Sequence, residues 1–453
     1  MTRLSCFKAY DIRGQVDVDL TEDLARDLGR AIATVLEART VVLGRDARAA
    51  SPRLLDALAG GLTSEGIDVL DLGLCGTEEV YFGTDHYGAD AGVMVTASHN
   101  PIEFNGFKLV GAGAAPLPDN VFRRIEAATT ARADAGGVID GSRQSVNCRD
   151  AYVARVLSFV DVSKLGPLKI LANAGNGAAG PTFDAVIAGL RAKDVAIEVE
   201  RLHHDPDPAF PNGIPNPLLP ENQPVTAAAV VASGADFGIA WDGDFDRCFF
   251  FDHTGAFIPG EYVVGLLAGS MLERFPGEGI VHDPRVYWNT QEVIARAGGR
   301  AIVSKTGHAL IKAKMRETNA VYGGEMSAHH YFRDFMHCDS GMIPWLLIAA
   351  YVSQTGQTLY ELVADMRGRF QSSGEINFRV DDAGSATERV HRAFAADVVK
   401  LDRLDGLSLE MTDWRLNLRS SNTEPLLRLN VEAKTEDIDL SSLVGAVSQL
   451  IEI

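Results

Sequence analysis

Short apolar runs that end in polar loops recur along this chain and alternate with amphipathic helical patterns. The clearest run, Ala-Gly-Val-Met-Val at 91–95, leads directly into Thr-Ala-Ser-His-Asn-Pro at 96–101. The run predicts a buried strand, and the Asn-Pro pair predicts a turn at its end. Strands that alternate with helices form parallel or mixed sheets, which bind ligands at the carboxyl ends of the strands. The alternation therefore predicts an α/β fold with Ser98 at a potential site.

The same alternation continues along the whole chain. Near the N-terminus it predicts helices and strands, in turn, at 20–36, 40–44, 53–62 and 67–72. The pattern restarts near residues 150 and 252, and a last unit begins near residue 369. We expect three similar mixed-sheet α/β domains in tandem, followed by a smaller α+β C-terminal domain, around a central cleft. The expected domains are 1–150, 151–252, 253–368 and 369–453.

Length, charge and cysteine spacing exclude several classes of protein. A chain of 453 residues exceeds one ordinary core. The formal net charge of −19 argues against a nucleic-acid partner or an anionic membrane, so an anionic substrate would need local arginine, lysine and backbone N–H groups. The five scattered cysteines form no C-x-x-C pair, which argues against a zinc finger or a disulfide framework. Without a long apolar segment, we expect a cytoplasmic protein.

Two polar segments around the first strong strand carry candidate groups. Ser98 and His99 are neighbours, and because adjacent side chains in an extended loop point apart, they do not form a ready-made hydrolase dyad. Further on, Asn-Gly at 105–106 predicts a turn, which Lys108 follows. A plain strand exit and a solvated hairpin lysine explain these residues equally well at this point.

Three aspartates alternate directly after a strand expected at 236–241: Asp242, Asp244 and Asp246. Alternate residues share one side of an extended segment, and Gly243 lets the backbone bend so that the carboxylates converge. Apolar residues flank them, and unpaired carboxylates so placed repel unless a cation joins them. Oxygen ligands suit Mg²⁺ or Ca²⁺, and an EF-hand is excluded because Arg247 and His253 replace its glycine and glutamate. The segment predicts a divalent-metal site.

A glycine-rich turn leaves an alternative open. Residues 175–180 read G-x-G-x-x-G between a strand expected at 169–172 and a helix expected at 181–190, and Glu198 and Glu200 follow about twenty residues on. This pattern is typical of a dinucleotide-binding turn, so a dinucleotide-dependent oxidoreductase is a second hypothesis. The glycines also suit a turn that only brings helix and strand close together.

The last unit contains a candidate anion site. A strand expected at 413–418 ends in Arg-Ser-Ser-Asn-Thr at 419–423. One arginine and several small hydroxyl and amide side chains in a turn between strands suit an oxyanion. An ordinary β-turn is the alternative interpretation.

Five motifs, in this order, resemble those of the α-D-phosphohexomutases: 96–101, 105–108, 242–246, 325–327 and 419–423. The resemblance implies that a phosphoserine exchanges its phosphoryl group with a sugar phosphate through a 1,6-bisphosphate. Residues 328–334 resemble the phosphomannomutases of the GDP-mannose route. The implied activity interconverts mannose 6-phosphate and mannose 1-phosphate. Dual use of glucose and mannose phosphates is the nearest alternative, and a non-catalytic sugar-phosphate-binding protein is a further one.

The resemblance also implies a role for individual residues. The implied catalytic residues are Ser98, Lys108, His99, Arg247, His308 and Arg13. The implied substrate-binding residues are Tyr10, Arg285, Gly307, Glu325, Ser327, His329, Arg419, Ser421, Asn422 and Thr423. An oxygen of phosphorylated Ser98 and the three aspartates would bind Mg²⁺, and a hexose 1,6-bisphosphate would act as activator. Arg285 stands where some relatives have lysine. We expect a small sugar phosphate as the only partner, and a monomer or weak dimer.

Overall fold

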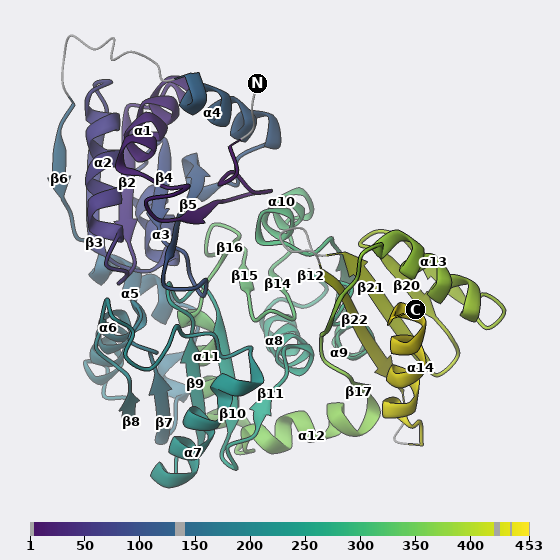
Figure 1. Cartoon of the computed structure of the whole chain (residues 1–453). Helices are drawn as coiled ribbons and strands as arrows, with labels where there is room; N and C mark the ends of the chain where they lie inside the picture. The colour runs from purple at the N-terminus through teal and green to yellow at the C-terminus, as the bar shows by residue number, and fades with distance from the viewer. Residues whose placement is uncertain (1–3, 132–140, 421–425, 435–436, 453) are drawn as a thin grey trace. The chain divides into compact units, whose positions relative to one another are not determined.

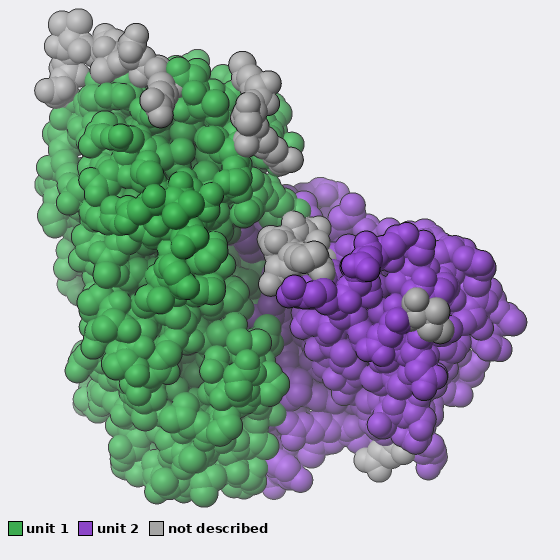
Figure 2. All heavy atoms as spheres, in the orientation of Figure 1, with its two compact units in different colours: residues 1–257, 329–356 green, residues 258–328, 357–453 purple. Residues whose placement is uncertain are grey.

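The computed structural model describes residues 4–131, 141–420, 426–434 and 437–452 (Figure 1). The chain divides into two compact units, and each is built from two segments of the sequence. Unit 1 comprises residues 1–257 and 329–356, and unit 2 comprises residues 258–328 and 357–453 (Figure 2). Each core is therefore assembled from segments that lie far apart along the chain.

The first sheet of unit 1 mixes parallel and antiparallel strands. Its order is β1-β5-β4-β2-β3-β6; β2 runs parallel to β3 and β4, whereas β5 runs antiparallel to β4 and β1. The strands are β1 (Ile12–Gln15), β2 (Thr40–Arg45), β3 (Asp68–Leu74), β4 (Ala91–Val95), β5 (Phe104–Gly111) and β6 (Arg143–Ser145). The Ser98 loop thus joins two antiparallel neighbours, β4 and β5, which a short connection can link.

Helices cover both faces of this sheet, as its near-continuous apolar strands require. On β2, Val41 and Leu43 belong to one apolar core and Val42 belongs to another on the opposite face. The helices are α1 (Glu22–Leu36), α2 (Ser51–Thr63), α3 (Thr77–His86) and α4 (Asp119–Ala131). Side chains from α1, α2 and α4 fill the first core, and Val80 of α3 lies in the second.

The second sheet of unit 1 has the order β11-β10-β9-β7-β8. Its strands are β7 (Leu168–Asn173), β8 (Ile197–Leu202), β9 (Phe237–Trp241), β10 (Cys248–Asp252) and β11 (Phe257–Ile258), and its helices are α5 (Arg149–Leu157), α6 (Ala179–Arg191), α7 (Gln223–Ser233) and α11 (Met342–Thr355). Strands β9 and β10 form an antiparallel hairpin in which Trp241 pairs with Cys248. The connecting loop of this hairpin, 242–247, is the acidic segment.

A short hairpin of the second segment completes unit 1. Strand β15 (His330–Phe332) pairs antiparallel with β16 (Cys338–Asp339). An isolated backbone bridge joins His329, just before β15, to Arg247 at the end of the acidic loop. This bridge brings residues from the second segment beside the acidic loop.

Unit 2 contains a parallel α/β part and an antiparallel C-terminal part. In the first, β12 (Gly279–His282) runs parallel to β13 (Arg300–Val303) and β14 (Tyr322–Gly324), with α8 (Gly260–Arg274), α9 (Trp288–Arg296), α10 (His308–Thr318) and α12 (Leu359–Arg369). The second has the order β17-β22-β21-β20-β19, with β18 also paired to β22. These elements are β17 (Gln371–Ser372), β18 (Ile376–Arg379), β19 (Lys400–Asp402), β20 (Leu407–Glu410), β21 (Trp414–Ser420), β22 (Leu426–Ala433), α13 (Ala383–Phe394) and α14 (Leu440–Glu452).

The structure confirms the predicted mixed-sheet α/β architecture with a smaller α+β C-terminal part. The first predicted helix is α1, and Thr21 caps it by accepting a hydrogen bond from the backbone N–H of Leu24. Several boundaries differ from the prediction by one or two residues, and one of these differences affects the glycine-rich turn. Helix α6 begins at Ala179, so Gly180 lies inside it instead of ending the turn. The four domain boundaries stay a prediction. Among the described residues, no helix is both long and apolar enough to cross a membrane.

Close contact between α1 and α2 depends on a glycine. A Cβ added at Gly61 would collide with the carbonyl oxygen of Arg26, whereas a Cβ at neighbouring Gly60 would meet nothing within 4 Å. We expect Gly61→Ala to lower the free energy of unfolding by about 2 kcal/mol, because the helices must separate. The control Gly60→Ala should leave it unchanged or raise it by up to about 1 kcal/mol. Urea denaturation measures both, and equal effects of the two variants would contradict this packing.

Candidate active site

Ser98 lies at the carboxyl end of β4 in a strained backbone conformation. Its φ of 50° falls in the left-handed region, which residues other than glycine adopt infrequently. Its backbone N–H donates to Thr96 Oγ1 at 2.8 Å, and its own Oγ donates to Asp242 Oδ2 at 2.6 Å. The serine is buried. The loop therefore fixes one hydroxyl group against one carboxylate.

The left-handed backbone also corrects the prediction made for His99. We expected the side chains of Ser98 and His99 to point apart, but Ser98 Oγ lies 3.0 Å from His99 Nδ1. That expectation assumed an extended loop, and the loop is not extended at Ser98. The same imidazole nitrogen contacts the Arg247 guanidinium. The side chains of Ser98 and His99 are therefore in contact.

Arg48 stabilises the loop that carries Ser98 through hydrogen bonds, and the sequence motifs did not identify this residue. Its guanidinium donates to the carbonyl oxygens of Ser98 at 3.0 Å, Asn100 at 2.5 Å, Pro101 at 2.9 Å and Phe104 at 3.0 Å. A guanidinium has five donors in a rigid fork, so one fully buried side chain can order a whole turn. The residue follows β2, some fifty positions before the loop it orders, and no local pattern marks it.

Asp46 also stabilises the loop that carries Ser98, by accepting hydrogen bonds. It accepts hydrogen bonds from Thr96 Oγ1 at 2.8 Å, from Ser51 Oγ at 2.5 Å and from the backbone N–H of Arg48 at 3.0 Å. Arg13, from β1, donates to the carbonyl oxygen of Thr96. Arg13 is thus beside the serine loop, as the resemblance implied.

The acidic loop brings three buried carboxylates together. Ligand atoms of Asp242, Asp244 and Asp246 all lie within 4.8 Å of one another. Within the described part of the chain, the Oδ1 atom of each is buried and accepts no hydrogen bond. Gly243 permits this loop to touch the serine loop, because a Cβ there would lie 2.6 Å from the carbonyl oxygen of Ser98. Three free carboxylate oxygens in one buried place fit a hard divalent cation.

Lys108 and Arg247 offset part of this negative charge. Lys108 donates to Asp244 Oδ2 at 2.7 Å and also to Asp246, so the alternative interpretation as a solvated hairpin lysine is excluded. Burial disfavours the ammonium, but the two carboxylates outweigh it and raise the pKa of Lys108 above its ordinary value. Arg247 donates to Asp242 Oδ2 through Nε at 2.8 Å and Nη2 at 2.6 Å.

The aspartates respond differently to their shared burial. Burial opposes ionisation of Asp242, yet the adjacent Arg247 lowers the pKa of this carboxyl below its ordinary value. For Asp244, burial and the charge of Asp246 together raise the pKa, despite the hydrogen bond from Thr77 Oγ1 at 2.5 Å. The surroundings therefore favour ionisation of Asp242 and oppose ionisation of Asp244.

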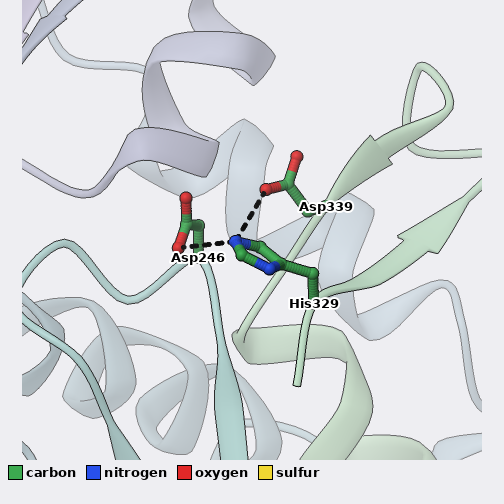
Figure 3. Close-up of side chains that lie close together, drawn as sticks. All are labelled: Asp246, His329 and Asp339. Atoms are coloured by element: carbon green, nitrogen blue, oxygen red, sulfur yellow. Dashed lines mark ion pairs between the residues drawn. The ribbon is translucent and has the colours of Figure 1, made fainter. Parts of the chain in front are cut away.

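His329 stands between two carboxylates of unit 1. Its Nε2 atom lies 3.6 Å from Asp246 Oδ1 and 4.0 Å from Asp339 Oδ2, and Figure 3 shows the imidazole between the two carboxylates. Asp339 comes from β16 and is fully buried. Sequence analysis did not identify it, because nothing around position 339 indicates a site. These distances place His329 beside the acidic loop.

The glycine-rich turn supports the acidic loop. The backbone N–H of Ala178 donates to the carbonyl oxygen of Gly243 at 3.0 Å. A Cβ at Gly177 would lie 2.8 Å from that oxygen, and a Cβ at Gly180 would collide with the carbonyl oxygen of His204. Close packing thus accounts for both glycines, as the second interpretation of this turn expected.

In unit 2, Arg285 joins several of the predicted substrate-binding residues. It donates to Asp283 Oδ2 through Nη2 at 2.5 Å and to Glu375 Oε2 through Nη1 at 3.0 Å, and Glu325 lies 3.9 Å from it. Glu325 in turn accepts a hydrogen bond from the backbone N–H of Gly307 at 2.8 Å. The structure therefore brings Arg285, Gly307 and Glu325 together within one unit.

Of the remaining predicted residues, Arg419 shares the carboxylate of Glu375 with Arg285. Arg419, on β21, is buried and lies 3.3 Å from Glu375. His308 is the first residue of α10, Ser327 follows β14, and Tyr10 is half-buried before β1. The predicted residues Ser421, Asn422 and Thr423 lie outside the described residues.

Comparison with known proteins matches the whole length of the chain. Family models for phosphoglucomutase/phosphomannomutase match as α/β/α domains I, II and III at residues 5–135, 150–255 and 259–370, and as the C-terminal domain at 375–446. A phosphomannomutase of Salmonella typhimurium is 54% identical over 437 residues, 96% of each chain. The phosphohexose mutases of Xanthomonas campestris are 55% identical over 452 residues, 99% of each chain.

A solved structure supports the same relationship. A phosphoglucomutase/phosphomannomutase family protein from Burkholderia thailandensis superposes with a TM-score of 0.86 at 32% sequence identity. The match covers 100% of this chain and 98% of that one.

The stabilisation of the Ser98 loop by Arg48 can be tested without measuring activity. Arg48→Lys keeps the charge but replaces the fork that reaches four carbonyl oxygens by a single ammonium, so we expect the free energy of unfolding to fall by about 3 kcal/mol. Hydrogen exchange of the amides at 97–105 should accelerate in the same variant. Arg53→Lys, on the exposed side of α2, is the control and should change stability by less than about 0.5 kcal/mol. Unchanged exchange in Arg48→Lys would show that the loop holds itself.

Proposed function

The chain belongs to the phosphoglucomutase/phosphomannomutase family, and from that premise we propose that it interconverts mannose 6-phosphate and mannose 1-phosphate. The observation that carries this proposal is the hydroxyl of Ser98, fixed 2.6 Å from Asp242 beside two further buried aspartates and two cations. The relatives that are named phosphomannomutase support the choice of sugar.

The proposed reaction transfers a phosphoryl group twice. Phosphorylated Ser98 passes its phosphoryl group to the 1-hydroxyl of mannose 6-phosphate, and the P–O bond to serine breaks as the new one forms. The resulting 1,6-bisphosphate turns around within the site. Its 6-phosphoryl group then returns to Ser98 Oγ, and mannose 1-phosphate leaves. A hexose 1,6-bisphosphate would restore the phosphoserine whenever it is lost.

Charge explains why the site needs its cations. Three aspartates and a phosphoserine dianion carry about −5 in total. Lys108 and Arg247 supply two positive charges at the positions described above. We propose that Mg²⁺ is held by Asp242, Asp244, Asp246 and an oxygen of phosphorylated Ser98. When bound, the ion would neutralise charge on the transferring phosphoryl group.

The chain's own residues bind and orient the reactants. The hydrogen bond from Ser98 Oγ to Asp242 fixes the direction of the nucleophile. Because its pKa is raised, Lys108 stays protonated and can donate a charged hydrogen bond to an oxygen of the transferring group. His99, Arg13 and His308 would complete the catalytic set, with His308 facing the sugar.

The substrate-binding part of the proposal rests mainly on unit 2. Glu325 and Ser327 would recognise the 3- and 4-hydroxyl groups of the hexose. The non-reacting phosphate would bind Arg419 with Ser421, Asn422 and Thr423. Tyr10, Arg285, Gly307 and His329 would line the rest of the site. We further propose that the enzyme works in the cytoplasm as a monomer or weak dimer, and that its product feeds GDP-mannose synthesis.

Removal of the serine hydroxyl tests the covalent step. We expect Ser98→Ala to lower turnover of mannose 6-phosphate by at least about a thousandfold, because no phosphoenzyme can form. Incubation with ³²P-labelled glucose 1,6-bisphosphate should label the wild type and leave Ser98→Ala unlabelled. Ser145→Ala, on the exposed edge strand β6, should behave like the wild type. Near-normal turnover of Ser98→Ala would refute the role of this serine.

The metal site has a separate test in thermal unfolding. Millimolar Mg²⁺ should raise the unfolding temperature of the wild type, because a ligand that binds only the folded state stabilises it. In Asp244→Asn this rise should disappear, while exposed Asp85→Asn should retain it. An equal rise in wild type and Asp244→Asn would place the ion elsewhere.

A further inference from the structure

Glu375 places one carboxylate among three arginines of unit 2. Its Oε2 atom lies 3.0 Å from Arg285 Nη1 and 3.3 Å from Arg419 Nη2, and its Oε1 atom lies 3.3 Å from Arg428 Nη1. The side chain is 17% exposed, so water screens these contacts only in part. Glu375 belongs to none of the motifs found in the sequence, and it directly precedes β18.

The two strand arginines need an anion. Arg419 and Arg428 are direct partners in the antiparallel register of β21 and β22. Like charges directly opposite each other on neighbouring strands destabilise a sheet. The charge of Arg285 is already matched by Asp283, which accepts from it at 2.5 Å. Glu375 contacts both members of this strand pair and offsets part of their charge.

Arg419 also has a hydrogen-bond donor that Glu375 does not use. Within the described residues, Nε of Arg419 is buried and donates no hydrogen bond. Burial opposes ionisation of Glu375, but Arg285, Arg428 and Arg419 outweigh it and lower the pKa of this carboxyl below its ordinary value. A permanent monoanion thus occupies a cluster of donors that could also bind a phosphate dianion.

We infer that Glu375 is an internal counter-ion that engages Arg419 and Arg428 in the free protein and competes with the substrate's non-reacting phosphate for them. The inference rests on the proposed function in one respect, namely that Arg419 binds that phosphate. When the phosphate group binds, it and Glu375 contact the same arginines, and the repulsion between the two anions lowers the affinity for phosphate. A lower affinity suits the 1,6-bisphosphate intermediate, whose bound phosphate must be released before the intermediate can turn around.

Inorganic phosphate is a suitable probe, because calorimetry measures its binding without turnover. We expect Glu375→Gln to bind phosphate about tenfold more tightly than the wild type, since a nearby like charge has been removed. Asp381→Asn makes the same change in net charge at an exposed position of the C-terminal part and should bind phosphate as the wild type does. Glu375→Asp keeps the charge and should also remain close to the wild type. Unchanged or weaker phosphate binding by Glu375→Gln would overturn the inference.

A double substitution separates this effect from phosphate binding at other places. In an Arg419→Ala background, Glu375→Gln should no longer tighten phosphate binding, because the contested arginine is gone. If it still does, the competition with Arg419 is refuted. A wild-type chain that binds phosphate but does not interconvert mannose phosphates would refute the proposed function and leave the Glu375 result standing. A functional mutase whose Glu375→Gln variant binds phosphate no more tightly would refute the inference alone.

Discussion

Mutual repulsion among three buried carboxylates is the constraint on which the candidate active site depends. Asp242, Asp244 and Asp246 converge in one hairpin loop, and only Lys108 and Arg247 lie against them as permanent cations among the described residues. Because Lys108 comes from the first sheet and the aspartates come from the second, this attraction joins the two sheets of unit 1. The charge left over favours a divalent ion and a site that handles phosphoryl groups.

The serine loop shows a similar dependence on distant residues. A left-handed conformation at Ser98 is costly, and it persists because surrounding groups fix it. Arg48 donates hydrogen bonds to four carbonyl oxygens of the loop, and Asp46 accepts one from Thr96. The loop is therefore prepared before any substrate arrives, which reduces the reorganisation needed during reaction.

Local patterns were sufficient to predict the strands, the serine loop and the aspartates, because each is encoded within a few neighbouring residues. They were insufficient for Arg48, whose partners lie about fifty positions further along the chain. Glu375 was missed for the same reason, and Asp339 was missed because nothing around it indicates a site. The contact between Ser98 and His99 was misjudged because the left-handed conformation of Ser98 could not be predicted from the neighbouring residues. The sequence of the glycine-rich turn is typical of dinucleotide binding, but close packing against the acidic loop explains its glycine at position 177.

³¹P NMR can show whether the enzyme interconverts hexose phosphates through a phosphoserine. The protein would be incubated with Mg²⁺ and mannose 6-phosphate, with and without a trace of hexose 1,6-bisphosphate, beside a parallel sample of glucose 6-phosphate. We predict a mannose 1-phosphate resonance that grows faster when the bisphosphate is present, and the glucose sample shows whether both sugars are used. Absence of any hexose 1-phosphate, with metal and activator supplied, would contradict the account.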